Sequence, residues 1–201
     1  MLFHQYLEQL LGNKASISIL RTLYRYKGKV FTVRGLADSA NVSVNETALT
    51  VERLEKFGIV GIQPVGRAHQ VTLNGESYIL NKIIEPIFIA ESKTLDELIL
   101  VLKKHLTTKK IFAAAIFGSV AKGEEKKDSD TDLLVISDDF AHAAIVISHA
   151  SEEAILKFYS KMSPLILSKK EFISKRNDAL IHSIIENHIM ITGIKLKGII
   201  K

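Results

Sequence analysis

The chain contains no cysteine among its 201 residues. This absence excludes a disulfide framework and a zinc site built on thiolates, and an intracellular reducing setting is the simplest expectation. Long apolar runs are missing too, because the longest, such as IFAAAIF at 111–117, are too short to cross a bilayer. The opening MLFHQYLEQLLGNK lacks a basic leader followed by a long apolar run. We therefore expect a cytoplasmic protein with no membrane partner.

Charge of one sign is not concentrated anywhere in the chain. The formal net charge is +5, from 27 lysines and arginines against 22 acidic residues, and no segment is a dense basic arm. This mild excess is compatible with a polyanionic partner but does not require one. Hydrophobic residues make up 47% of the chain, which is enough to bury the core of one medium domain or two small ones.

The first third of the chain predicts three helices in succession. Apolar residues recur at helical spacing over 14–26. A second helix is expected after Thr32 as N-cap, and a third begins at Ser43, with Glu46 completing a capping box and Gly58 ending it. The residues expected on the buried side of the third helix are Ala48, Leu49, Leu54 and Phe57. Two helices joined by a short turn indicate a helix-turn-helix.

A β-hairpin is expected next. The runs IVGIQPV and HQVTLN are short, β-prone and separated by GRA, and Pro64 confines the first strand to an edge of its sheet. Three helices followed by a hairpin resemble the winged-helix DNA-binding domains of bacterial and archaeal transcription regulators, over about residues 14–74.

That resemblance implies double-stranded DNA as a partner. The third helix would enter the major groove, the wing tip would reach phosphate or the minor groove, and the second helix would grip the backbone. The residues available for these contacts are Ser43, Asn45, Thr47 and Thr50, with Arg67 at the wing tip and Arg34 on the second helix. Winged helices also serve as dimerisation or docking modules, and Glu46 and Glu52 place negative charge where phosphate would lie. A homodimer therefore stays open as an alternative partner for this domain.

Helical periodicity returns from Glu76 to about Leu106, and Pro86 and the ESK around Ser92 are expected to break it into two helices. This region is the expected connector. The predicted domains are a winged helix at 1–90, a helical connector at 91–108 and a second domain at 109–201.

The stretch FGSVAKGEEKKDSDTDLLV, at 117–135, carries the residues best suited to chemistry. A buried strand leads into Gly118 and Ser119, and after ten intervening residues Asp130 and Asp132 open a second apolar strand. Residues two apart on a strand face the same side, so both carboxylates can share one divalent ion. Glycine lets the backbone approach a phosphate closely, and Ser119 can donate hydrogen bonds to it. The alternative is a solvated, charged loop.

This stretch resembles the signature of the DNA polymerase beta nucleotidyltransferase superfamily, particularly its minimal prokaryotic members, over about residues 109–193. The resemblance implies Mg²⁺ or Mn²⁺ as cofactor and a nucleoside triphosphate as substrate or ligand. The residues it assigns are Asp130 and Asp132 to catalysis and the metal, and Gly118, Ser119, Lys122 and Ser129 to the nucleotide. The expected fold class is α+β, a winged helix-turn-helix followed by an α/β nucleotidyltransferase domain with a small mixed sheet.

Active members of that superfamily use a third carboxylate on a neighbouring strand. In this chain the corresponding strand is expected at SPLILS, where Ser163 takes the place of the acid, and Glu171 stands beyond the strand as an expected helix cap. One hypothesis is an enzyme that transfers a nucleoside monophosphate from a nucleoside triphosphate to an unknown hydroxyl acceptor. The alternative is a DNA-binding transcriptional regulator whose second domain is a nucleotide sensor or is catalytically degenerate.

Overall fold

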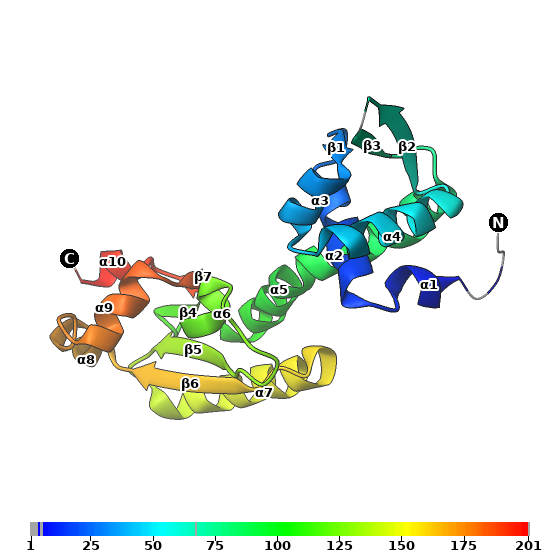
Figure 1. Ribbon diagram of the computed structural model, residues 1–201. Coiled ribbons are helices and arrows are strands. Elements are labelled where there is room, and N and C mark those ends of the chain that lie inside the picture. The colour runs from blue at the N-terminus through cyan, green and yellow to red at the C-terminus, as the bar shows by residue number, and fades with distance from the viewer. Residues whose placement is uncertain (1–3, 5, 67, 201) are drawn as a thin grey trace. The chain divides into compact units, whose positions relative to one another are not determined.

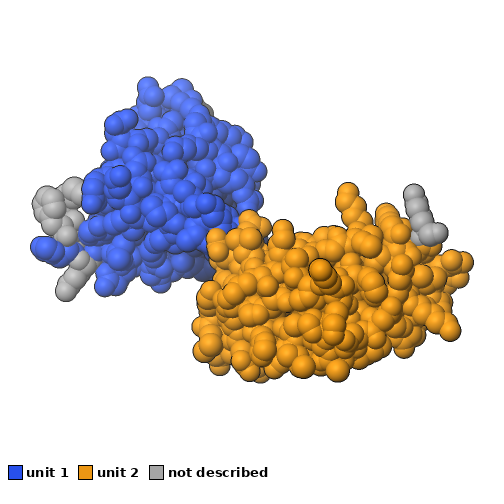
Figure 2. All heavy atoms as spheres, turned by 180° about the vertical axis from the view of Figure 1, so that it is seen from behind, with its two compact units in different colours: residues 1–93 blue, residues 94–201 orange. Residues whose placement is uncertain are grey.

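The computed structural model describes residues 4, 6–66 and 68–200, with the side chain of residue 68 left out. The chain divides into two compact units, residues 1–93 and 94–201, coloured separately in Figure 2. Within the described residues, no helix is long and apolar enough to cross a membrane.

The first unit is a winged helix, as predicted (Figure 1). Its helices are α1 (Leu7–Leu11), α2 (Lys14–Arg25), α3 (Val33–Ala40) and α4 (Val44–Lys56). Its strands are β1 (Phe31–Thr32), β2 (Val60–Val65) and β3 (Ala68–Leu73), which form an antiparallel sheet in the order β1-β3-β2. Pro64 therefore lies on an edge strand, as expected, where its missing N–H breaks no ladder between two neighbours.

Local capping sets the starts of these helices. The side chain of Thr32 accepts a hydrogen bond from the N–H of Gly35 at 3.0 Å, and that of Ser43 accepts from the N–H of Glu46 at 3.3 Å. This bond at Ser43 is one of the two hydrogen bonds that make up the capping box predicted there. A reciprocal box forms elsewhere, at Ser168 and Glu171. Short-range sequence signals thus placed both helix starts correctly.

A single helix, α5 (Glu85–Leu106), replaces the two helices expected around Pro86 and Ser92. A π-helical turn, η1 (Leu80–Ile84), ends two residues before Pro86, and this wider turn lets the chain pass a residue that cannot donate a helical hydrogen bond. The hydroxyl of Ser92 donates to the carbonyl of Ile89 at 2.9 Å, so this polar side chain bonds within the helix without ending it.

The second unit is built on a mixed four-stranded sheet in the order β6-β5-β4-β7 (Figure 1). The strands are β4 (Ala113–Phe117), β5 (Thr131–Ile136), β6 (Met162–Leu167) and β7 (Ile189–Gly193). The helices are α6 (Gly118–Lys122), α7 (Phe140–Phe158), α8 (Lys169–Ser174), α9 (Ala179–Glu186) and α10 (Leu196–Ile199). Strands β5 and β6 are parallel, and the other pairs are antiparallel. The predicted α+β class and small mixed sheet are confirmed.

Both faces of this sheet are buried. Ala114, Ile116, Leu133 and Val135 pack on one side against the second half of α5 and against α7. The alternate residues of the same strands pack on the other side against α8, α9 and α10. Burial on both faces explains why β4 and β5 read as continuous apolar runs in the sequence.

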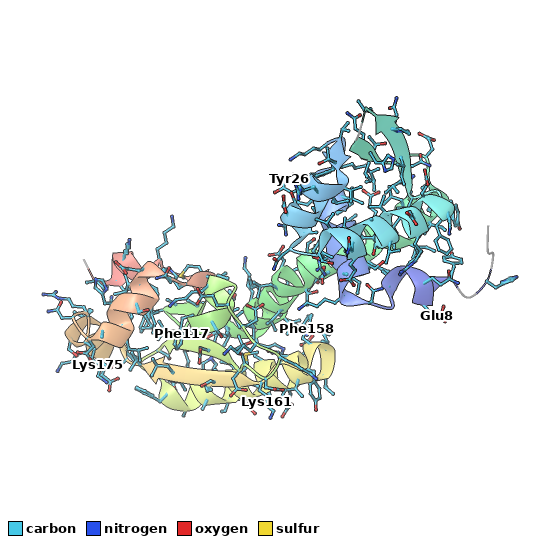
Figure 3. The ribbon with its side chains drawn as sticks, in the orientation of Figure 1. Glu8, Tyr26, Phe117, Phe158, Lys161 and Lys175 are labelled. Atoms are coloured by element: carbon cyan, nitrogen blue, oxygen red, sulfur yellow. The ribbon has the colours of Figure 1, made fainter. Side chains whose placement is uncertain are left out.

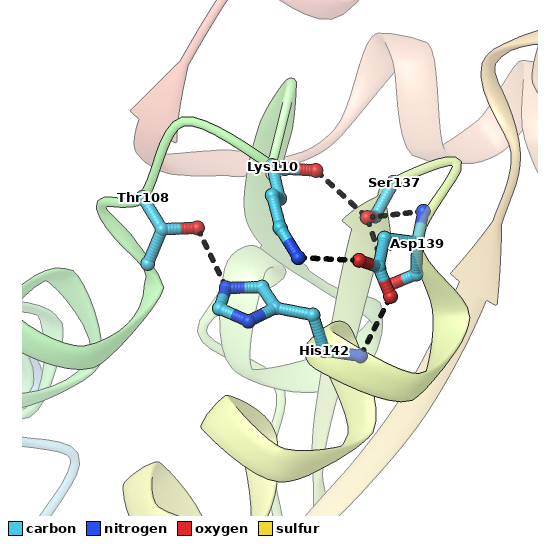
Figure 4. Close-up of polar contacts among 5 residues, drawn as sticks. All are labelled: Thr108, Lys110, Ser137, Asp139 and His142. Carbon is cyan, nitrogen blue, oxygen red and sulfur yellow. Dashed lines mark hydrogen bonds and ion pairs between the residues drawn. The ribbon is translucent and has the colours of Figure 1, made fainter.

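A polar network closes the end of β5 that carries Ile136 (Figure 4). The buried hydroxyl of Ser137 donates to the carbonyl of Lys110 at 2.7 Å, and the ammonium of Lys110 pairs with Asp139 at 2.7 Å. Asp139 also caps α7 by accepting from the N–H of His142, whose ring contacts Thr108. The Lys110 hydrogen bond, followed by that cap bond, lowers the pKa of Asp139. The network anchors this end and leaves the opposite end for Asp130 and Asp132.

Candidate functional site

The pairing of β4 with β5 brings the two halves of the motif together. Phe117 lies opposite Asp132 in the antiparallel register, so Gly118 follows immediately beside the Asp-x-Asp segment. Gly118 has a φ of +72°, and a Cβ added there would overlap Oδ2 of Asp132. Only glycine therefore fits between the end of β4 and this carboxylate. Gly118 and Asp132 are in contact, although the sequence separates them by a long polar loop.

The short helix α6 and the following loop hold the remaining nucleotide-binding candidates. Ser119 is half-buried, and its carbonyl accepts from the N–H of Glu124 at 2.9 Å, just after Gly123 ends the helix at a φ of +68°. Lys122 is exposed. The hydroxyl of Ser129 accepts from the N–H of Lys126 at 2.9 Å, so this side chain stabilises the loop. The exposed residues leave this part of the site open to a solvent-borne ligand.

The two aspartates differ in their surroundings. Asp130 is exposed, whereas Asp132 is half-buried. Burial raises the pKa of Asp132, and the negative charge of Asp130 raises it further. Two carboxylates that repel each other in this way suit a divalent cation, which neutralises both and prefers oxygen ligands. The donor set therefore fits one such ion.

Thr131 holds this pair of aspartates in place, a role that sequence reasoning missed. Its side chain is buried, and its hydroxyl is 2.8 Å from that of Ser160, two residues before β6. Its N–H donates to the carbonyl of Lys161 at 2.8 Å. Period-two alternation could have shown that Thr131 points away from the aspartates. Nothing in the sequence indicated Ser160 as its partner.

Ser163, the residue expected in place of a third carboxylate, lies on the strand next to Asp132. In the parallel register of β5 and β6, Ser163 is the partner of Asp132, and its side chain is exposed. Glu171 is committed elsewhere, because its Oε2 accepts from the N–H and the hydroxyl of Ser168 at 2.8 and 2.7 Å. These bonds lower the pKa of Glu171. They hold it beyond the far end of β6, which runs parallel to β5 away from Asp132.

Histidine, aspartate and glutamate side chains nowhere gather into a metal site of three or more groups within the described residues. Asp130 and Asp132 are thus two carboxylates without a third such group gathered beside them in the described part of the chain.

In the winged helix, two of the predicted DNA contacts are wrong. Thr47 and Thr50 are buried at 0% and 1% exposure, whereas Leu49, expected inside, is 62% exposed. The apolar stripe of α4 runs through Val51 and Leu54, and helical spacing places positions 47 and 50 on that same stripe. The methyl groups of threonine allow this burial.

The other candidates for DNA contact keep accessible positions. Arg34, Ser43 and Asn45 are exposed, and Ser43 uses its hydroxyl as the acceptor of the N-cap bond. Arg67, expected at the wing tip, lies outside the described residues. Glu46 and Glu52 are exposed on α4 as well. The accessible surface of this helix therefore carries polar and acidic groups together with the apolar side chains of Val44 and Leu49 and the basic side chain of Lys56.

Comparisons with solved structures return distant likenesses only. NolR from Sinorhizobium fredii is 17% identical, over 42% of this chain and 77% of that one, with a TM-score of 0.34. A toxin–antitoxin with AMP-PNP is 13% identical, over 53% and 81%, with a TM-score of 0.36. TrmBL2, an archaeal chromatin protein, is 18% identical, over 90% and 72%, with a TM-score of 0.30. No curated protein matches the chain significantly.

A family model identifies the second unit. Residues 97–195 match the model described as polymerase beta, nucleotidyltransferase. The match begins within α5 and ends just after β7, so it covers the whole sheet and the Gly118 to Asp132 motif. The chain thus carries a nucleotidyltransferase domain of the polymerase beta family, joined to an N-terminal winged helix.

Proposed function

We propose that the second unit binds a nucleoside triphosphate together with Mg²⁺ or Mn²⁺. We also propose that this chain is a DNA-binding regulator and that the bound nucleotide controls its activity. The carrying observation is the contact between Gly118 and Asp132, because it places the phosphate-binding glycine beside the aspartates. Gly118, Ser119 and Lys122 would face the phosphates. Asp130 and Asp132 would hold the cation, which neutralises phosphate charge when bound.

The pairing of Asp132 with Ser163 favours binding over transfer. The cation that accompanies the triphosphate would keep two carboxylate ligands, whereas the ion that activates an attacking hydroxyl would lack one. Glu171 cannot substitute while it caps α8. These features support a nucleotide sensor with slow or absent chemistry. Membership of a transferase family favours the second candidate, transfer of a nucleoside monophosphate to a hydroxyl acceptor.

We further propose that the first unit binds double-stranded DNA through α4 and the hairpin. The three helices and wing support this, as do the exposed side chains of Arg34, Ser43 and Asn45. Arg67 is proposed as a further DNA contact. Ser129 belongs to the nucleotide-binding proposal for the second unit. DNA and nucleoside triphosphates are both available in the cytoplasm, where we expect the protein to act.

Nucleotide titration by calorimetry, with and without Mg²⁺, tests the site. Wild-type protein should bind the triphosphate in a metal-dependent manner, and combining Asp130→Asn with Asp132→Asn should abolish that dependence. Asp128→Asn is the matched control, because Asp128 is an exposed acid of the same loop outside the motif. Undiminished Mg²⁺-dependent binding by the double variant would overturn the assignment.

A second assay separates sensing from transfer and tests DNA binding. Incubation with an α-labelled triphosphate should give bound nucleotide but little labelled product from the wild-type protein. Gel shifts with duplex DNA should show binding that weakens with salt, and Arg34→Ala should reduce that salt dependence by about one phosphate contact. Asn45→Ala should mainly alter sequence preference. Absence of duplex binding at low salt would leave the winged helix as a docking module.

A further inference from the structure

The long helix α7 has one face in the core and an opposite face that carries large exposed apolar side chains. Ala143, Ile147, Ala150 and Ala154 pack against the sheet. On the outward face Ile145 is 57% exposed, Leu156 is 86% exposed and Tyr159, directly after the helix, is 90% exposed. Figure 3 labels Phe158, the last residue of α7, and Lys161, which directly precedes β6. Large apolar groups exposed along one helix face are the usual sign of an interaction surface.

The outward stripe has a regular composition. Residues 145, 149, 152 and 156 follow the spacing of three and four that places side chains on one line of a helix. Two of them are apolar and two, His149 and Glu152, are polar and exposed. The ring of His149 lies 6.5 Å from that of His105 on α5, measured between ring centroids, and it stays accessible to a partner. Lys157 lies off this line and pairs with Glu153 at 2.7 Å, so it brings no positive charge onto the stripe. We call this line of residues the α7 stripe.

We propose that the α7 stripes of two copies of this chain pack against each other in an antiparallel pair. In one register, Ile145 lies opposite the partner's Leu156, and His149 lies opposite the partner's Glu152. The twofold axis repeats both contacts. A histidine ring N–H can donate a hydrogen bond to a carboxylate, so the polar pair is complementary at the point where the apolar pairs flank it.

This complementarity favours a second copy over an unrelated partner. In a symmetric pair the same patch supplies both sides of every contact. The α7 stripe meets that requirement with both its apolar ends and its polar centre. A register shifted by one turn would place Glu152 against an apolar residue and leave a carboxylate without a donor. The apolar residues of the α7 stripe therefore provide the attraction between two copies, and its polar pair selects the register.

The expected association is weak. Helix α7 has 19 residues, which at 1.5 Å each is a contact of about 28 Å along a single helix. A strip of this length and about 10 Å wide covers roughly 280 Å², below the roughly 800 Å² that each partner buries in a stable complex. We expect a dissociation constant on the order of micromolar. If the proposed DNA binding also holds, the dimer would carry two winged helices and could read two half-sites.

Sedimentation velocity of the full chain over a concentration series tests the dimer. Wild type should shift from monomer to dimer, and Leu156→Glu should stay monomeric at every concentration. Circular dichroism and thermal unfolding should be unchanged in this variant, since the side chain is exposed. Leu180→Glu is the matched control, because Leu180 is 54% exposed on α9, which covers the other sheet face. A wild-type chain that remains monomeric throughout would overturn the proposal.

Crosslinking tests the register, and the absence of native cysteine makes it clean. Combining Ile145→Cys with Leu156→Cys should give a covalent dimer under mild oxidation. The two positions are eleven residues apart on one helix, about 16 Å, so they cannot bond within a single chain. Combining Ile145→Cys with Glu152→Cys is the out-of-register control and should crosslink poorly. Dimers that survive Leu156→Glu and do not crosslink at 145 and 156 would show that a different surface is used.

Discussion

Gly118 lies directly against Asp132, so closely that any side chain at position 118 would overlap the carboxylate. The backbone of Gly118 also has a positive φ, which side-chain-bearing residues adopt only at a cost. The contact joins the residue that follows β4 to the second residue of β5. Both the close approach and the φ value exclude other residues.

We expect Gly118→Ala to lower the free energy of unfolding by about 2 kcal/mol and to weaken metal-dependent nucleotide binding, since it adds an overlap to the backbone strain. Gly123→Ala is the matched control. Gly123 has a similar φ of +68°, yet nothing lies within 4 Å of an added Cβ. Chemical denaturation and calorimetry measure both effects. Equal losses in the two variants would show that the contact with Asp132 is unimportant.

Ser163→Asp should raise transfer of a labelled nucleotide, because it restores a carboxylate beside Asp132. The size of the gain depends on geometry, since catalytic positions are sensitive to errors of about 1 Å. Ser163→Asn, which adds a similar volume without charge, is the control. Strong wild-type transfer that is insensitive to Ser163 but lost in Glu171→Gln would place the third ligand at Glu171 instead.

Asp132→Asn tests the raised pKa of this residue. A raised carboxyl pKa means that the folded state holds the proton more tightly, so stability is lost as the pH rises through the folded pKa. The metal-free variant should be at least as stable as wild type at pH 7, and its advantage should disappear near pH 3, where the acid is protonated in both states. Thermal unfolding across pH in a chelator measures this. A variant less stable at pH 7 would contradict it.

Thr47→Val should stabilise the winged helix by about 1 kcal/mol, because the buried hydroxyl of Thr47 has no hydrogen-bond partner in the described structure. DNA binding should be unchanged, since position 47 faces the core. Asn45→Ala on the exposed face should show the opposite pattern. A variant Thr47→Val that alters sequence preference in gel shifts would return this residue to the DNA contact surface.

Glu153→Gln should destabilise the second unit at neutral pH. Hydrogen bonds from Lys157, Lys104 and His105 lower the pKa of Glu153, so its stabilising contribution is present above the unfolded pKa and lost as the pH falls. The difference in melting temperature from wild type should therefore shrink below about pH 4.5. Exposed Glu152→Gln, which has no intramolecular ion pair among the described residues, is the control. A gap that widens in acid would contradict the sign.

Short-range signals were enough to predict much of this protein. The N-caps Thr32 and Ser43 were predictable because each satisfies a backbone N–H only three residues away. The apolar runs of β4 and β5 indicated buried strands, and the spacing from Gly118 to Asp132 indicated the family. These features depend on neighbours in the chain, so the sequence by itself determined them.

Long-range packing decided the rest. The buried stripe of α4 took in Thr47 and Thr50 and left Leu49 outside, because the core selects one helical phase and local propensity does not. The bond between Thr131 and Ser160 joins two strands through their pairing, and the carboxylate of Glu171 is used up by the cap at Ser168. The exposed face of α7 could be identified only from the structure, which shows that the opposite face of this helix packs on the sheet. Each of these depends on which distant residues the fold brings together, a property that no local pattern records.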